Sequence, residues 1–279
     1  MADPRDQWRA LITTRSGLEF DLAAPDPAQV RLDDIAHALS LQCRFNGHGR
    51  AFYSVAQHAV LVADLVAVWA GAEERAEPAF SGDDPDDGQR VDGLSGAAEP
   101  THQLRINKLA RAALHHDDAE AYTGDLVSPL KAMMPAFVRI ERRVHASIAV
   151  ALDLPLYMPS VVKRLDRLAA ALEAYSLFDP VPQWVWRGLA TFPELVARVA
   201  SDETRASDGA QLVPVTPCTA EEARERFLVR ARMLDEERRT LLVPWSPACP
   251  PPLDLAPPTE SSFAKAGPYP PDRPLGEPR

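Results

Sequence analysis

Two histidines and four carboxylates fall within thirteen residues of this chain, between positions 113 and 125. The stretch reads Ala-Leu-His-His-Asp-Asp-Ala-Glu-Ala-Tyr-Thr-Gly-Asp and has the composition of a helix. Charged groups are costly to bury unless they are paired or bind a metal ion. The stretch therefore indicates either a solvated helix face or part of a metal site whose other ligands lie elsewhere in the chain.

Three predicted helices each place a metal-binding side chain on an otherwise apolar stripe. These side chains are His58, the doublet His116 and Asp117, and Asp166. Taken alone, His58 is typical of a buried core histidine and Asp166 of a surface ion-pair residue. Together, two imidazoles and two carboxylates leave room for water and suit Mn²⁺, Co²⁺, Fe²⁺ or Zn²⁺ better than Mg²⁺. The set therefore predicts one divalent metal, with its identity left open.

The choice of histidine within the doublet stretch is open, because His115 precedes His116. Residues four apart on a helix share a face. On this phase His116 falls on the stripe formed by Leu109, Ala113 and Glu120, whereas His115 falls beside it. The phase favours His116, and His115 stays an alternative ligand.

The ligand positions lie in a series of amphipathic helices. Ser54 and Gln57 form a capping box that begins a helix through His58, and Thr219 and Glu222 form a second one. The other helices are expected at about 34–41 with Asp33 or Asp34 as the cap, from Leu104 through the doublet, from Ser128 as the cap of a short helix, at 135–152 and at 159–178.

The 159–178 helix carries two acidic residues on its apolar stripe, which consists of Val162, Asp166, Ala169, Glu173 and Leu177. No convincing run of alternating strands follows residue 20, and a short strand or hairpin is expected before it. The pattern therefore predicts an all-α fold.

Three parts are expected along the chain: an N-terminal segment 1–29, a helical catalytic domain 30–243 and a tail 244–279. The tail holds twelve of the 27 prolines, which favours disordered or extended chain. Residues 71–103 are rich in Gly, Pro and Asp and predict an acidic mobile insertion within the helical domain.

Composition excludes several classes of protein. The net charge of −10 opposes sequence-independent binding of nucleic acid. The three cysteines are scattered without a CxxC motif, which argues against a disulfide framework and fits a reducing cytosol. Neither a signal peptide nor a run of 18 apolar residues is evident, so we expect a cytoplasmic protein without a membrane partner.

The order of His58, the His116–Asp117 doublet and Asp166 on consecutive helices resembles the HD-domain metal-dependent phosphohydrolases. The resemblance covers about residues 30–180 and implies an HD-domain helical bundle. The Cys-Arg-Phe run at 43–45, the Ser-Val-Ala-Gln-His run at 54–58 and the stretch at 116–125 are similar to the 5′-deoxynucleotidase branch and its phage-encoded relatives.

That branch implies roles for further residues. Its glutamate three residues after the doublet serves acid–base chemistry, and an aspartate five residues further helps to hold the substrate; here these are Glu120 and Asp125. Arg44 and the aromatic Phe45 would contact the nucleotide. Phe45 stands where these nucleotidases carry Trp, which leaves the sugar preference open.

Other roles are less defined by the pattern. His48 and Lys131 are further candidates for substrate binding. Arg44 also reads as an ordinary surface arginine, Phe45 as a core residue and Glu120 as a helix-surface charge.

The expected reaction is removal of phosphate from deoxynucleoside monophosphates by a metal-activated water, with in-line attack. Glu120 would take the proton of the water or protonate the leaving oxygen. A deoxynucleoside triphosphohydrolase would use the same four ligands and remains an alternative.

A protein of a different class, a helical binding protein with a vestigial metal site, is the second alternative. The acidic insertion and the Pro-rich tail would be its interaction segments, but the intact ligand set argues against degeneration. The expected partner is a small nucleotide, and a homo-oligomer is suggested only by analogy with the family.

Overall fold

The computed structural model describes residues 10–73, 101–193, 195–196 and 215–242, and these residues are mostly helical. Strands β1 (Leu11–Thr13) and β2 (Glu19–Asp21) pair antiparallel as a short hairpin, with Ile12 opposite Phe20. The predicted all-α class with a short N-terminal hairpin is confirmed.

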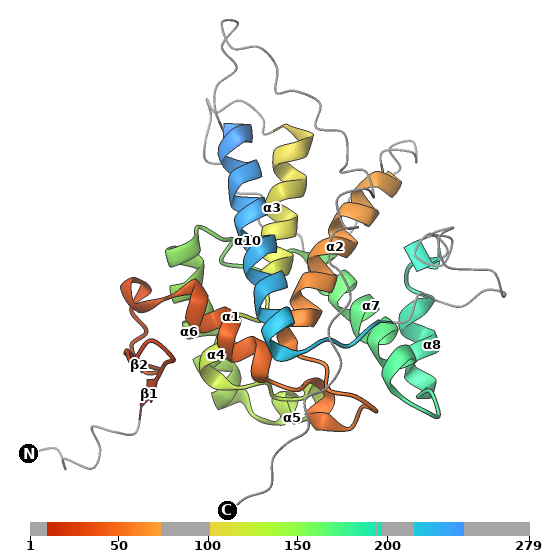
Figure 1. Ribbon diagram of the computed structural model, residues 1–279, viewed down its shortest axis with the longest axis horizontal. Helices are drawn as coiled ribbons and strands as arrows, with labels where there is room; N and C mark the ends of the chain where they lie inside the picture. The colour runs from red at the N-terminus through yellow and green to blue at the C-terminus, as the bar shows by residue number, and fades with distance from the viewer. Residues whose placement is uncertain (1–9, 74–100, 194, 197–214, 243–279) are drawn as a thin grey trace, which may run out of the picture. The chain divides into compact units, whose positions relative to one another are not determined.

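The helical elements follow the hairpin in the order shown in Figure 1. They are η2 (Pro27–Gln29), α1 (Leu32–Leu41), η3 (Arg44–Gly47), α2 (Val55–Glu73), α3 (His102–Leu114), α4 (Glu120–Thr123), α5 (Ser128–Met133), α6 (Pro135–Leu152), α7 (Ser160–Leu177), α8 (Gln183–Leu189) and α10 (Ala220–Leu242). No helix among the described residues is both long and apolar enough to cross a membrane.

Both predicted capping boxes are confirmed. The Gln57 N–H donates to Ser54 Oγ (3.2 Å), and the Ser54 N–H donates to Gln57 Oε1 (3.4 Å). At α10 the Glu222 N–H donates to Thr219 Oγ1 (3.2 Å), and the Thr219 N–H donates to Glu222 Oε2 (2.9 Å). These reciprocal bonds satisfy backbone donors that the first helical turn leaves free, so local sequence fixes where both helices begin.

Two predicted caps are wrong. The N-cap of α1 is Arg31, and Asp34 lies inside the helix, where it accepts hydrogen bonds from the N–H (2.9 Å) and Oγ (2.7 Å) of Ser16. This long-range contact ties the hairpin to α1 and removes the carboxylate from the capping role. Asp33 pairs with Arg224 of α10 (2.8 Å). Ser128 is the first residue of α5 and not its cap.

The predicted insertion at 71–103 is too long at both ends. Helix α2 continues to Glu73, and α3 begins after Thr101, whose Oγ1 accepts from the Leu104 N–H (3.3 Å). The remainder of the predicted insertion and the predicted Pro-rich tail lie outside the described residues.

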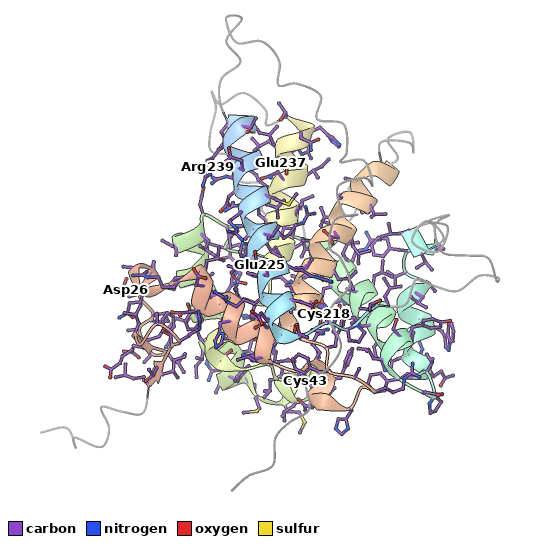
Figure 2. The ribbon with its side chains drawn as sticks, in the orientation of Figure 1. Asp26, Cys43, Cys218, Glu225, Glu237 and Arg239 are labelled. Carbon is purple, nitrogen blue, oxygen red and sulfur yellow. The ribbon has the colours of Figure 1, made fainter. Side chains whose placement is uncertain are left out.

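Helix α3 packs against both α2 and α10, and α7 packs against α2 on one side and α8 on another. On α10, Glu237 accepts from Gln103 Nε2 (3.0 Å) and Asn107 Nδ2 (2.9 Å), which fixes α3 beside it (Figure 2). Fully buried side chains of this core include Ile35, Leu39, Val62, Leu114, Ile148, Leu165, Leu168 and Phe227. The core thus holds α2, α3 and α7, the helices that carry or adjoin the predicted ligands.

The seam between α7 and α8 requires a glycine. A Cβ atom at Gly188 would lie 2.7 Å from the Cβ of Ala171, closer than real side chains approach. We expect Gly188→Ala to lower the free energy of unfolding by about 1–3 kcal/mol because the helices must separate, measured by urea denaturation. Gly49→Ala is the matched control, since its Cβ would lie 3.4 Å from Leu177 in ordinary contact. Equal losses in both variants would contradict the close seam.

Candidate metal centre

The doublet lies in a turn and not, as predicted, within a helix. Helix α3 ends at Leu114, residues 115–119 form turns, and α4 begins at Glu120. Inside the turn, His115 Nδ1 bonds to Asp118 Oδ2 (2.7 Å). His116 Nδ1 bonds to the carbonyl oxygen of Ala113, which would accept from the Asp117 N–H if the helix continued, and such side-chain bonds to backbone compete with continued helix.

The two neighbouring histidines lie in different environments. His115 is buried and packs edge-on against Phe227 of α10, with ring centroids 5.7 Å apart. His116 points to His58 of α2, with 3.2 Å between their Nε2 atoms. The structure therefore places His116 in the ligand cluster and His115 in the packing between α3 and α10.

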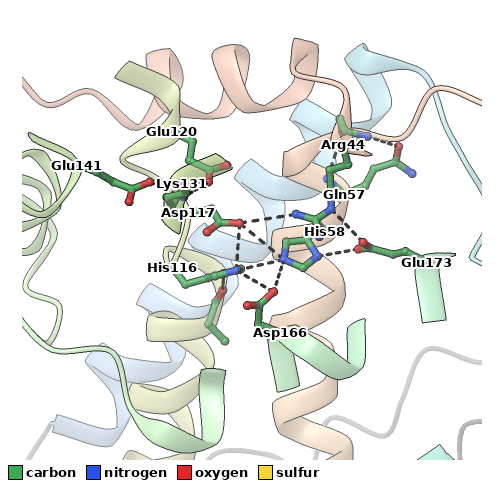
Figure 3. Close-up of polar contacts among 12 residues, drawn as sticks. Arg44, Gln57, His58, His116, Asp117, Glu120, Lys131, Glu141, Asp166 and Glu173 are labelled. Atoms are coloured by element: carbon green, nitrogen blue, oxygen red, sulfur yellow. Dashed lines mark hydrogen bonds and ion pairs between the residues drawn. The ribbon is translucent and has the colours of Figure 1, made fainter. Parts of the chain in front are cut away.

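Four predicted ligands converge from three parts of the fold: His58 from α2, His116 and Asp117 from the turn, and Asp166 from α7 (Figure 3). His58 Nε2 lies 3.1 Å from Asp166 Oδ1 and 3.7 Å from Asp117 Oδ2. His116 Nε2 lies 3.1 Å from Asp117 Oδ2 and 3.8 Å from Asp166 Oδ1. With metal–ligand bonds of about 2.1 Å, neighbouring ligands of one ion lie about 3.0–3.4 Å apart. His58, His116 and Asp117 therefore form a group that could hold a single ion, and Asp166 contacts both histidines of that group.

Hydrogen bonds behind the two imidazoles orient them for metal binding. His116 Nδ1 bonds to the carbonyl oxygen of Ala113 (2.7 Å), and His58 Nδ1 bonds to Glu173 Oε1 (2.7 Å). A carbonyl oxygen and a carboxylate accept hydrogen bonds, so each Nδ1 carries the hydrogen. Both Nε2 lone pairs then face the cluster, the arrangement that metal-binding histidines adopt.

Electrostatics favour a cation at this point. Burial lowers the pKa of His116, but the Asp117 and Asp166 carboxylates raise it well above its usual value. Burial raises the pKa of Asp117, but the effect of His116 and His58 is larger, and the pKa lies below its usual value. Burial likewise raises the pKa of Asp166, and hydrogen bonds from both histidines lower it below its usual value. Two carboxylates with lowered pKa values thus face two imidazoles with raised pKa values. A divalent ion would take the place of protons here, so these four residues fit a metal.

Glu120 lies beside the ligand cluster, near Asp117. Its Oε1 accepts from Lys131 Nζ (3.1 Å), which also donates to Glu141 (2.6 Å). Burial and the charges of Asp117 and Asp125 raise the pKa of Glu120 to about 9, although Lys131 opposes this shift. Glu120 Oε2 is buried and has no hydrogen-bond partner among the described residues. Burial and the neighbouring carboxylates therefore favour the protonated form of Glu120, whose second oxygen has no partner among the described residues.

Arg44 approaches the cluster from the opposite side on η3. Its Nε donates to Glu173 Oε2 (2.9 Å), and its Nη1 lies 3.9 Å from Asp117 Oδ2. The next two residues, Phe45 and Asn46, have φ values of 56° and 50°, a left-handed conformation that costs energy for residues other than glycine. The chain therefore bends sharply directly after Arg44, whose guanidinium contacts Glu173.

The remaining candidates lie at different distances from the ligands. Phe45 packs edge-on against Phe178 (5.3 Å between centroids). Asp125 is partly buried, which raises its pKa, and the charges of Arg44 and Asp117 act on it. His48 is exposed, and within the described residues no side-chain contact joins it to the cluster. The structure thus brings Glu120, Lys131 and Arg44 to the ligands and leaves His48 outside.

Sequence reasoning gave no role to Glu173 or Glu141. Glu173 is fully buried on α7, two turns after Asp166, and contacts both His58 and Arg44. Its position on the apolar stripe of the helix indicates burial, and a buried carboxylate needs partners. Its partners are more than a hundred residues away in sequence, so no local pattern identified them.

No protein-family model matches the sequence. The uncharacterized protein RCAP_rcc00048 of Rhodobacter capsulatus is 32% identical over 174 residues, which are 60% of this chain and 71% of that protein. The uncharacterized protein YfdR of Escherichia coli is 32% identical over 168 residues, which are 60% of this chain and 72% of that protein.

Replacement of each histidine by asparagine tests which one binds metal. An asparagine Nδ2 takes the place of the histidine Nδ1–H but offers no Nε2. We expect His116→Asn to lose most bound Mn²⁺ or Co²⁺ and His115→Asn to keep it, because the latter preserves the bond to Asp118. The measurement is metal stoichiometry after gel filtration, by mass spectrometry. Metal loss in His115→Asn alone would assign the site to the other histidine.

Proposed function

This chain belongs to the same protein family as RCAP_rcc00048 and YfdR, and we propose that it is a metal-dependent phosphohydrolase of the HD-domain type. The most specific form of the proposal is a 5′-deoxynucleotidase that releases phosphate from deoxynucleoside monophosphates. The observation that carries it is the convergence of His58, His116 and Asp117, whose ligand atoms lie within 4.8 Å of one another, with Asp166 Oδ1 3.1 Å and 3.8 Å from the two imidazole nitrogens and with Glu120 and Arg44 beside them.

The metal would be held by His58, His116, Asp117 and Asp166. A mixed set of nitrogen and oxygen ligands is suited to Mn²⁺, Co²⁺, Fe²⁺ or Zn²⁺. When bound, such an ion would activate water for attack and offset charge on the phosphate.

Arg44 would bind the phosphate group. Glu173 occupies its Nε, which leaves the two terminal nitrogens of the guanidinium for a partner on the side of Asp117. Two parallel N–H groups match two phosphate oxygens. Arg44 would therefore fix the phosphorus atom in front of the ligand cluster.

Glu120 would act as the general acid. Burial and the charges of Asp117 and Asp125 raise its pKa and so favour its protonated form, which could donate a proton to the leaving 5′ oxygen as the phosphorus–oxygen bond breaks. The hydroxyl group of water is added to phosphorus, and the water's second proton replaces the one that Glu120 has given up. Lys131 holds the Glu120 carboxyl in place.

Charge near the site supports a monophosphate substrate. Within the described residues, the cations in contact with the site's acidic groups are Arg44 and Lys131. Arg44 already pairs with Glu173, and Lys131 pairs with Glu120 and Glu141. Little positive charge is left to bind the β- and γ-phosphates of a nucleoside triphosphate. The triphosphohydrolase alternative therefore has less support.

Product analysis on a panel of nucleotides tests the proposed function. We expect inorganic phosphate from deoxynucleoside monophosphates with Mn²⁺ or Co²⁺, less with Mg²⁺, and none from Asp117→Ala, which also loses its metal. Release of tripolyphosphate from deoxynucleoside triphosphates would identify the alternative reaction. Bound metal without any product would favour a binding protein, and full activity of Asp117→Ala would refute the metal mechanism.

Glu120→Gln separates acid catalysis from metal binding. We expect kcat to fall about 10²–10⁴-fold with Mn²⁺ affinity unchanged, because the amide keeps the shape but has no acidic proton. In the wild type, the acid is available below its pKa, so kcat should decrease as pH rises, with a midpoint at or below about 9 since a bound cation lowers the pKa. A kcat that increases with pH through this range would make Glu120 a base.

A further inference from the structure

Glu173 connects two groups that the proposed mechanism treats separately. Its side chain has no exposed surface. One oxygen bonds to Nδ1 of the metal ligand His58 (2.7 Å), and the other accepts from Nε of Arg44 (2.9 Å). In Figure 3, Glu173 lies on the far side of the His58 ring from His116, with Arg44 reaching toward it.

We propose that Glu173 is a positioning residue that couples metal binding at His58 to the orientation of Arg44. The inference rests on the proposed metal centre and adds that the metal site and the phosphate-binding arginine form one unit. Neither group then keeps its geometry when the other is removed.

The burial of Glu173 makes the two contacts interdependent. A buried carboxylate is stable when its charge is balanced and its oxygens are hydrogen-bonded, and removal of one partner leaves an uncompensated charge. The backbone carbonyl of the buried Tyr53 accepts from the Arg44 N–H (2.9 Å), so the backbone of Arg44 is held independently of its guanidinium. Loss of the Arg44 guanidinium would therefore shift Glu173 and, through it, the imidazole of His58.

The loop of Arg44 also has an attachment to α7 that does not involve Glu173. The Arg50 N–H donates to Leu177 O (2.8 Å), and Arg50 Nη2 donates to Ser176 O (2.8 Å). These bonds would keep the loop on α7 when Arg44 is replaced. Arg50 is therefore a matched control, because it is an arginine of the same loop that binds the same helix without contacting Glu173.

Coupling of this kind is reciprocal. If the orientation of Arg44 changes the affinity for metal, then metal must stabilise the oriented state of Arg44 by the same factor. The partners behind metal-binding histidines typically contribute 10–100-fold to metal affinity. We expect the lower part of this range, because a histidine has other sources of orientation in a packed core.

The test is calorimetric titration of metal-free protein with Mn²⁺ in the absence of nucleotide. We expect Arg44→Met and Glu173→Gln each to weaken Mn²⁺ binding about tenfold and Arg50→Met to leave it unchanged. In Glu173→Gln, the amide oxygen can accept from His58 Nδ1. The amide NH₂ group then faces Arg44 Nε, which is also a donor, so that hydrogen bond is lost. The double variant should lose about as much as one single variant, because both changes break the same unit.

The coupling is refuted if Arg44→Met binds Mn²⁺ as the wild type does, or if the double variant loses the product of the two single losses. Circular dichroism melts report folding, and if Glu173→Gln does not fold, the comparison of Arg44→Met with Arg50→Met decides alone. A wild type that binds Mn²⁺ but releases no phosphate would refute the proposed function and leave the coupling intact. A wild type without Mn²⁺ binding would refute both.

Discussion

Carboxylate oxygens and unprotonated histidine nitrogens that point at a common centre repel one another. A cation or protons between them remove this repulsion. The described helices meet at such a centre. His58 comes from α2, Asp166 from α7, and the doublet from the turn that follows α3. These ligands come from separate segments, so the packing of α3 and α7 against α2 is what brings them together. The same helix contacts therefore form the core and position the ligands.

Much of the helical framework is readable from sequence because its signals are local. The two capping boxes fix the starts of α2 and α10, and α6 spans the predicted 135–152. The break after α3 is not predictable from periodicity, because the stretch keeps the composition of a helix and the side chains that bond within the turn do not alter its hydrophobic spacing. Helical phase favoured His116, but the residue lies in a turn to which that phase does not apply. The reason for its placement is instead the end of α3.

Long-range contacts account for the rest of what sequence left open. Asp34 looked like a cap and instead binds Ser16 of the hairpin, eighteen residues earlier. Glu173 looked like an acidic residue on an apolar stripe, and its role depends on His58 and Arg44, which lie in other segments. A single sequence reports spacing within an element and contains no measure of which elements will meet. The ligand types were thus readable, whereas the groups that orient them were not.

Several carboxylates gather at the site. Asp117, Asp166, Glu120 and Asp125 lie around the cluster, and the chain carries a net charge of −10. An anionic substrate would meet repulsion here unless a metal had first offset the carboxylates. Arg44 cannot do this alone, because Glu173 already balances its charge. If the proposed function holds, phosphate binding must therefore depend on the metal. The metal would also explain the buried acidic residues, because burying their charge is costly without a bound cation.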